Sequence, residues 1–132
     1  MPTLNLNVTL NNGSLDVDQS GNGNQMGRNQ TGDFVWKLTG NAASGTFNPI
    51  DPSNPRSGFQ WKQTPPGTVF GTPTRENQDR HIKLSDNNTD PGGINSQGSW
   101  IYQLWATING VEYSTISTIP TAVVTNPNIK NM

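Results

Sequence analysis

Residues 99–116 read SWIYQLWATI-NG-VEYSTI, and this stretch predicts an antiparallel β-hairpin. Asn109-Gly110 is the preferred pair for a two-residue type I′ turn, because both central residues take a positive φ. The turn sets four opposed pairs along the two strands: Ile108 with Val111, Ala106 with Tyr113, Leu104 with Thr115, and Trp100 with Ile119. These residues share one face, and that face is largely apolar, so the hairpin is expected to bury it in a core.

The opposite face of this hairpin also carries large apolar side chains, although the outer face of a two-layer sandwich is usually polar. Four residues make up this second face: Ile101, Gln103, Trp105 and Ile116. Two alternatives follow. An open patch would form a subunit contact, or a platform on which a sugar ring stacks with Gln103 beside it. Otherwise a long loop, 19–32 or 49–58, folds over the patch and covers it.

The rest of the chain shows the same alternation over short segments. A second hairpin is predicted over residues 3–18, where Asn12-Gly13 would place Leu10 opposite Leu15. The same turn would place Val8 opposite Val17. Further strands are predicted over 33–39, 45–48, 59–62, 80–85 and 122–125. Loops are expected over 19–32, 49–58 and 86–98, with a polar connection over 72–80.

No segment of ten or more residues shows the 3.6-residue periodicity of a helix. Short strands separated by Pro, Gly and Asn are typical of two packed sheets. The sequence therefore predicts an all-β protein, an immunoglobulin-like antiparallel β-sandwich with Greek-key connections and about seven to nine strands. At 132 residues, a single domain over 1–132 is expected.

The composition restricts the classes of partner. Charged residues make up 13% of the chain and the net charge is −1, whereas an average domain has about 25% charged residues. Such a surface cannot attract a polyanion, so no nucleic-acid partner is expected. Low net charge weakens the repulsion between copies, which favours a homo-oligomer or larger assembly, or a neutral ligand such as a carbohydrate.

Disulfides and thiolate metal sites are excluded, since the chain has no cysteine. No apolar stretch approaches the ~20 residues of a membrane-spanning helix, so no membrane span is expected. Residues 1–7 lack the basic and apolar regions of a signal peptide. The sequence therefore leaves the localisation unknown.

Residues 86–90 read DNNTD and place oxygen-bearing side chains at positions 1, 3 and 5, as calcium-binding loops do. The candidate ligands are Asp86, Asn88 and Asp90. The pattern then departs from a calcium loop, because Pro91 and Gln97 stand where Gly and Glu are required. A plain turn after position 90 is the alternative interpretation. No other cofactor is predicted.

Nothing in the sequence indicates an enzyme. His81 is the only histidine, and its place in a strand predicts an exposed side chain rather than a general base. The Gly-x-Ser-x-Gly motif of a nucleophilic serine is absent. The nine carboxylates are scattered through turns without an evident pair. No catalytic residue is therefore assigned.

The final third of the chain contains four short motifs: DNN at 86–88, GSWIYQL at 98–104, GVEYST at 110–115 and NPNIKN at 126–131. This arrangement resembles the ending of the bacterial DP-EP family, small proteins of unknown function. It is similar, more distantly, to the inclusion-body proteins of the PixA/AidA type. Asn126 stands where that ending has Asp. The resemblance implies an immunoglobulin-like sandwich that sometimes accumulates as assemblies, and it implies no catalytic residue.

These observations predict a non-enzymatic β-sandwich that acts by protein contact, through self-assembly or another structural role. The alternative is a carbohydrate-binding module, a lectin, that uses an exposed Trp105 or Trp61 as its platform and is assisted by calcium. Trp61 shares a face with Phe59, which favours a place in the core.

Overall fold

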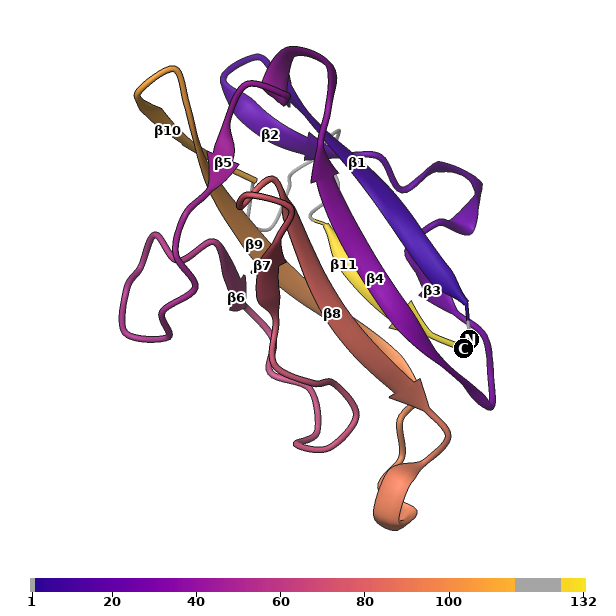
Figure 1. Cartoon of the computed structure of the whole chain (residues 1–132). Helices are drawn as coiled ribbons and strands as arrows, with labels where there is room; N and C mark the ends of the chain where they lie inside the picture. The colour runs from indigo at the N-terminus through magenta and orange to yellow at the C-terminus, as the bar shows by residue number, and fades with distance from the viewer. Residues whose placement is uncertain (1, 116–126) are drawn as a thin grey trace.

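The computed structural model describes residues 2–115 and 127–132, and two packed β-sheets form a sandwich (Figure 1). The first sheet has the order β2-β1-β4-β8-β7. Its strands are β1 (Thr3–Asn11), β2 (Ser14–Val17), β4 (Gln30–Leu38), β7 (Thr74–Glu76) and β8 (His81–Asn88). The all-β prediction is confirmed.

The second sheet has the order β10-β9-β11-β3, and β5 and β6 also pair with β9. Its strands are β3 (Gln25–Met26), β5 (Thr46–Phe47), β6 (Phe59–Trp61), β9 (Gly98–Ile108), β10 (Val111–Ser114) and β11 (Asn128–Asn131). Three short 3-10 turns complete the described residues: η1 (Ser20–Asn22), η2 (Gly40–Ala42) and η3 (Pro91–Gly93). Within these residues, no helix has the length and apolar character needed to cross a bilayer.

Both predicted hairpins form in the predicted register. In the β9–β10 hairpin, Val111 pairs with Ile108 and Tyr113 pairs with Ala106. In the β1–β2 hairpin, Leu10 pairs with Leu15. All four turn residues have a positive φ: Asn12 52°, Gly13 81°, Asn109 51° and Gly110 79°. The expected pair of Trp100 with Ile119 and the expected strand over 122–125 lie outside the described residues.

The two sheets are mixed rather than purely antiparallel, and eleven strands rather than seven to nine lie in the described parts of the chain. Strands β1 and β4 pair in parallel, and so do β3 and β11. A parallel pair requires a connection that crosses over. Residues 18–29 supply it, because β3 takes the chain to the second sheet before β4 returns it to the first.

Two loop predictions are therefore partly wrong. The segment 19–32 contains β3 and the start of β4, and Met26 within it is fully buried. The segment 86–98 begins inside β8, which runs to Asn88. The polar connection over 72–80 likewise contains β7. Strands β3 and β7 have only two and three residues and few apolar side chains, so they show no alternation. The equally short β5 and β6 lie within the predicted strands 45–48 and 59–62.

Aromatic side chains fill the centre of the sandwich. Trp36 of β4 is fully buried and donates a hydrogen bond from Nε1 to the hydroxyl of Tyr102, 2.7 Å away. The ring of Phe59 stacks on Tyr102 with a centroid separation of 5.3 Å. Trp61 packs against Phe59 at the edge of this core and is only partly buried. The aromatic core joins β4 to β6 and β9, which fixes the position of β9.

Candidate functional site

Strand β9 separates its side chains into a core face and an outer face, as the alternation predicts. The buried set comprises Tyr102, Leu104, Ala106 and Ile108. On the outer face, Ile101, Trp105 and Thr107 are only partly buried. Trp105 therefore lies where the sequence places it, on the side of the sheet away from the core.

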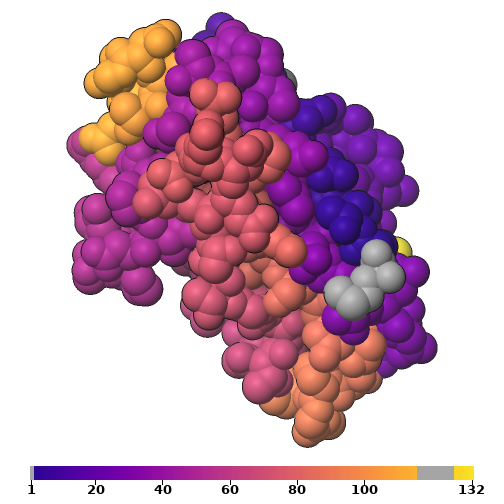
Figure 2. All heavy atoms as spheres, viewed as in Figure 1, coloured from indigo at the N-terminus to yellow at the C-terminus, as the bar shows by residue number. Residues whose placement is uncertain are grey.

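Loop 49–58 lies over one face of the Trp105 ring. The guanidinium carbon of Arg56 is 5.4 Å from the ring centroid, which is within cation–π range. The backbone N–H of Trp105 donates to the carbonyl of Gly58 (3.2 Å). The loop and the hairpin tip lie on the same side of the molecule, the magenta and orange parts in Figure 2. Of the two alternatives for this face, the structure therefore shows a partial cover by loop 49–58.

Asn48 and Glu112 fix Arg56 above the ring. Asn48 is 7% exposed, and its Nδ2 donates to the Arg56 carbonyl (3.0 Å) and to Glu112 Oε2 (2.9 Å). The other carboxylate oxygen of Glu112 accepts from Arg56 Nη1 at 2.8 Å. Thr107 donates its hydroxyl to Asn48 Oδ1 (2.8 Å). We call Arg56, Trp105, Thr107 and Glu112 the contact surface.

The other predicted members of this face have different environments. The side-chain nitrogen of Gln103 donates to the carbonyl of Thr115 (3.1 Å) inside the hairpin, and Gln103 is 8% exposed. Ile101 is partly buried, and its N–H donates to Gln63 Oε1 (3.2 Å). Ile116 lies outside the described residues. The structure thus groups Trp105 with Arg56 and Glu112, two residues that sequence patterns gave no reason to select.

The three candidate calcium ligands face different partners. Asp86 and Asn88 are fully buried on β8, and Asp86 Oδ1 accepts from Asn131 Nδ2 (2.9 Å). Asn88 Oδ1 accepts the hydroxyl of Ser96 (2.7 Å). Within the described residues, no three His, Cys, Asp or Glu side chains form a group suited to a metal ion. The calcium site stays a prediction, and a calcium titration of thermal stability would test it.

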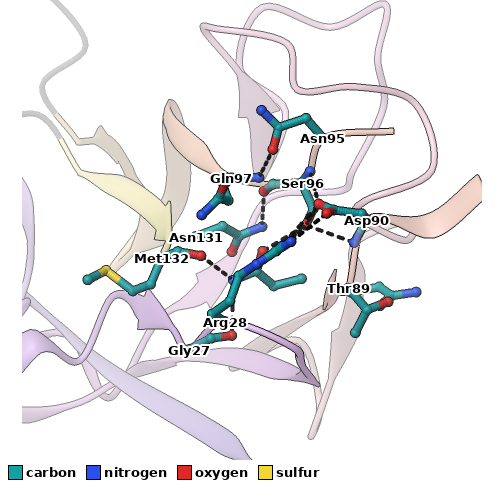
Figure 3. Close-up of polar contacts among 11 residues, drawn as sticks. Gly27, Arg28, Thr89, Asp90, Asn95, Ser96, Gln97, Asn131 and Met132 are labelled. Carbon is teal, nitrogen blue, oxygen red and sulfur yellow. Dashed lines mark hydrogen bonds and ion pairs between the residues drawn. The ribbon is translucent and has the colours of Figure 1, made fainter. Parts of the chain in front are cut away.

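A polar cluster at the end of β8 surrounds Ser96 and closes the loop 89–98 (Figure 3). Both carboxylate oxygens of Asp90 are paired with Arg28, and Asp90 Oδ1 also accepts the N–H of Ser96 (3.0 Å). The Arg28 guanidinium holds the pKa of Asp90 well below its usual range, because the hydrogen bond favours the carboxylate. Ser96 is fully buried and saturated with hydrogen bonds. Its hydroxyl therefore serves as a structural group rather than as a nucleophile.

His81 lies on the outer face of β8 and is partly exposed. Its Nε2 lies 3.3 Å from the amide of Asn77. Burial lowers the pKa of His81, Lys37 lowers it further, and Glu76 opposes the shift. A catalytic triad requires a serine and a carboxylate bonded to the imidazole, and among the described residues neither is hydrogen-bonded to His81.

A shallow polar hollow of about 430 Å³ lies on the outer face of the first sheet. Its lining comprises Asn7, Thr9, Asp16, Val17, Asp18, Gln19 and Thr39. Thr9 and Asp16 are paired across β1 and β2, so their side chains lie side by side. The sequence gave no signal for this hollow, because its residues read as the ordinary polar side of a hairpin.

No protein-family model matches this chain, and no curated protein sequence matches it. The DP-EP and PixA/AidA resemblance therefore stays a prediction.

Proposed function

We propose that this protein is a non-enzymatic β-sandwich that works by protein contact, and that its main partner is a second copy of itself. The observation that carries the proposal is the contact surface, where Arg56 is held over Trp105 and bonded to Glu112. Tryptophan and arginine are the residue types most often found at energetically dominant positions of interfaces.

Charge balance favours another copy as the partner. The net charge is −1, so copies repel one another weakly. The contact surface carries one positive and one negative side chain, Arg56 and Glu112, which are 57% and 38% exposed. In a two-fold arrangement the same patch meets itself. Each Arg56 can then face the Glu112 of the other copy.

The loop that carries Arg56 is held in place before any partner arrives. The N–H of Asp51 donates to Ser57 Oγ (2.9 Å), and Ser57 Oγ donates to the Phe59 carbonyl (3.0 Å). The N–H of Gly58 donates to the Pro49 carbonyl (3.1 Å). A Cβ on Gly58 would lie 2.2 Å from the Asn48 carbonyl oxygen, so the turn requires glycine. A loop ordered in advance loses little entropy when it binds.

Size-exclusion chromatography with light scattering, over low to high micromolar concentrations, tests the proposal. We expect the wild type to associate with increasing concentration, and Arg56→Glu to stay monomeric because it places two acids together at the contact surface. Lys130→Glu is the matched control. It makes the same charge change near Ser99, its register partner, six residues and roughly 20 Å along β9 from Trp105. A wild type that is monomeric at high micromolar concentration would overturn the proposal.

Carbohydrate binding is the second candidate function, and the polar hollow favours it. Amide, hydroxyl and carboxylate groups line that hollow, and they are groups that hydrogen-bond to sugar hydroxyls. A glycan array, with and without calcium, tests this candidate. Loss of binding in Asp16→Ala would assign the ligand to the hollow, and loss in Trp105→Ala would assign it to the contact surface. An array without signal in either condition would remove this candidate.

A further inference from the structure

The side chains of Asp86 and Asn131 meet between the two sheets, and each has an oxygen atom without a partner. Asp86 is fully buried and Asn131 is 3% exposed. The Nδ2 of Asn131 donates to Asp86 Oδ1 (2.9 Å) and to the Ser96 carbonyl (2.8 Å), as the close-up around Asn131 shows in part (Figure 3). Asp86 Oδ2 and Asn131 Oδ1 are enclosed without a hydrogen-bond partner. Because a buried unpartnered oxygen is costly, this pair requires a physical explanation.

We propose that Asp86 is a neutral carboxylic acid in the folded protein, and that its Oδ2–H proton fastens β11 to β8 by donating to Asn131 Oδ1. Both unpartnered atoms are acceptors when Asp86 is ionised, so neither can serve the other. One proton on Oδ2 converts one of them into a donor. An amide and a carboxylic acid then complement each other through two hydrogen bonds, of which Nδ2 to Oδ1 is already formed.

Among the residues that the structure describes, no positively charged side chain bonds to Asp86 to stabilise a carboxylate. Gly32 is its register partner on β4, and Phe70 forms a bridge with it from the other side. The side chain that bonds to it from β11, Asn131, does not titrate, and the second acceptor of Asn131 Nδ2 is the neutral Ser96 carbonyl. Burial raises the pKa of Asp86 to about 7, and the bond from Asn131 opposes that shift.

The charged groups nearest in the hydrogen-bond network are already occupied. Arg28 is paired with Asp90, and this pair reaches the cluster only through Ser96. A proton is therefore the simplest positive charge that can satisfy Asp86.

This arrangement makes the attachment of β11 sensitive to pH. Asn131 links β11 to the opposite sheet across 45 residues of chain, and β11 is the strand with which β3 pairs. Loss of the proton places a charge between the sheets and removes the Oδ2 bond, so β11 is expected to loosen as pH rises past neutral. The inference is independent of the contact surface, which lies near the other end of β9.

Urea unfolding of the whole chain, followed by tryptophan fluorescence from pH 4 to pH 9, compares the wild type with Asp86→Asn. The amide in this variant keeps both hydrogen bonds and cannot ionise. Because the folded pKa lies above the unfolded value of 3.8, the stabilisation is complete below that value and is lost as pH rises through about 7. We expect the folding constant of the wild type to fall relative to the variant by up to tenfold per pH unit between about pH 4 and pH 7, and then to level off.

Asp33→Asn is the control, since it also removes one carboxylate but lies beside Lys83 (3.8 Å). The folding constant of the wild type should show no such fall relative to Asp33→Asn between pH 4 and pH 7. A difference between wild type and Asp86→Asn that does not change from pH 4 to pH 8 would overturn the proposal. Stabilisation of the wild type by calcium chloride, absent in Asp86→Asn, would also overturn it, because a cation would then occupy the place of the proton.

Hydrogen exchange of the wild type gives a second measurement, which holds even if Asp86→Asn does not fold. After correction for the intrinsic pH dependence of exchange, the backbone amides of β11 should lose protection above about pH 7, before those of β1 and β4. Protection of β11 that does not change across this range would contradict the proposal.

Discussion

Two buried asparagines, Asn48 and Asn88, hold loops at opposite ends of β9, and they differ in what they join. Each donates from Nδ2 to at least one backbone carbonyl, and each accepts a hydrogen bond from a hydroxyl on Oδ1. An ion pair accompanies each of them, Arg56–Glu112 beside Asn48 and Arg28–Asp90 beside Asn88. The same chemistry therefore serves both ends of the sandwich.

The two asparagines differ in which segments supply the groups that accept their Nδ2 hydrogen bonds. Asn48 connects one loop to one hairpin, with its ion pair at the surface. Asn88 donates to the carbonyls of Met26, Gly27 and Met132, so a single amide joins β8 to both β3 and the end of β11. The comparison teaches that a buried amide contributes to the whole fold only when its acceptors come from several segments. Four substitutions test this.

The largest effect is expected for Asn88→Ala. It removes the hydrogen bonds to three carbonyls and the bond from the Ser96 hydroxyl at once, and it leaves a buried cavity, so the free energy of unfolding should fall by about 3–5 kcal/mol in urea titrations. Asn87→Ala is the neighbouring control, because that side chain is only partly buried and bonds to two threonine hydroxyls. Its cost should stay under about 1 kcal/mol. Equal losses of unfolding free energy in both variants would contradict the idea that the bonds of Asn88 to several segments stabilise the whole fold.

Asn48→Ala should cost less, about 2 kcal/mol, because its partners can turn toward water. The loss should be local, so loop 49–58 becomes easier to cleave while the sandwich stays folded. Limited proteolysis with mapping of the first cut measures this. A first cut elsewhere, at the rate seen for the wild type, would contradict the comparison.

Asp90→Asn is expected to have a smaller effect, which depends on pH. The depressed pKa of Asp90 means that its stabilisation is present above the unfolded value near 3.8 and is lost as pH falls below it. The melting temperature of the variant should therefore lie below that of the wild type at pH 7, and the gap should narrow progressively from about pH 4 toward pH 2. Asparagine tolerates the positive φ of 50° at this position, so backbone strain does not complicate the measurement. A gap as wide at pH 2 as at pH 7 would exclude the ion pair as its cause.

The smallest effect is expected for Arg56→Met. The Arg56–Glu112 pair is exposed, and exposed pairs contribute about 0.5 kcal/mol. The loss should shrink further in 1 M NaCl, where screening acts within about 3 Å. Thermal melts at low and high salt measure it, and a loss that is unchanged by salt would indicate packing on Trp105 rather than charge.

The fold could be predicted well because two Asn-Gly turns fix the register of their hairpins without any knowledge of tertiary contacts. The alternation of buried residues also continues into the polar end of β8, where the residue types do not indicate burial. Ile82, Leu84, Asp86 and Asn88 are all buried at every second position of β8. The last two continue the strand to Asn88, but Asp and Asn are side chains typical of turns and calcium loops, so the predicted strand ends at residue 85.

The contact surface could be predicted only in part. Trp105 was selected because it is apolar on a face that should be polar. Arg56 and Glu112 join it from segments that are 56 residues apart from each other, and no local pattern relates them. The partner of Asp86 is 45 residues away, for the same reason. Sequence patterns identify strands, whereas side-chain pairs that close a fold depend on the topology.

The pairing of β3 with β11 has a consequence for how the chain is made. Asn24, which adjoins β3, bonds to Asn128 of β11, and the two are 104 residues apart. A ribosome that adds 5–20 residues per second needs roughly 5–20 seconds to cover that interval. Throughout this time the second sheet lacks β11, and the incomplete fold is accessible to chaperones and proteases. Completion of the native state is thus a late event of biosynthesis.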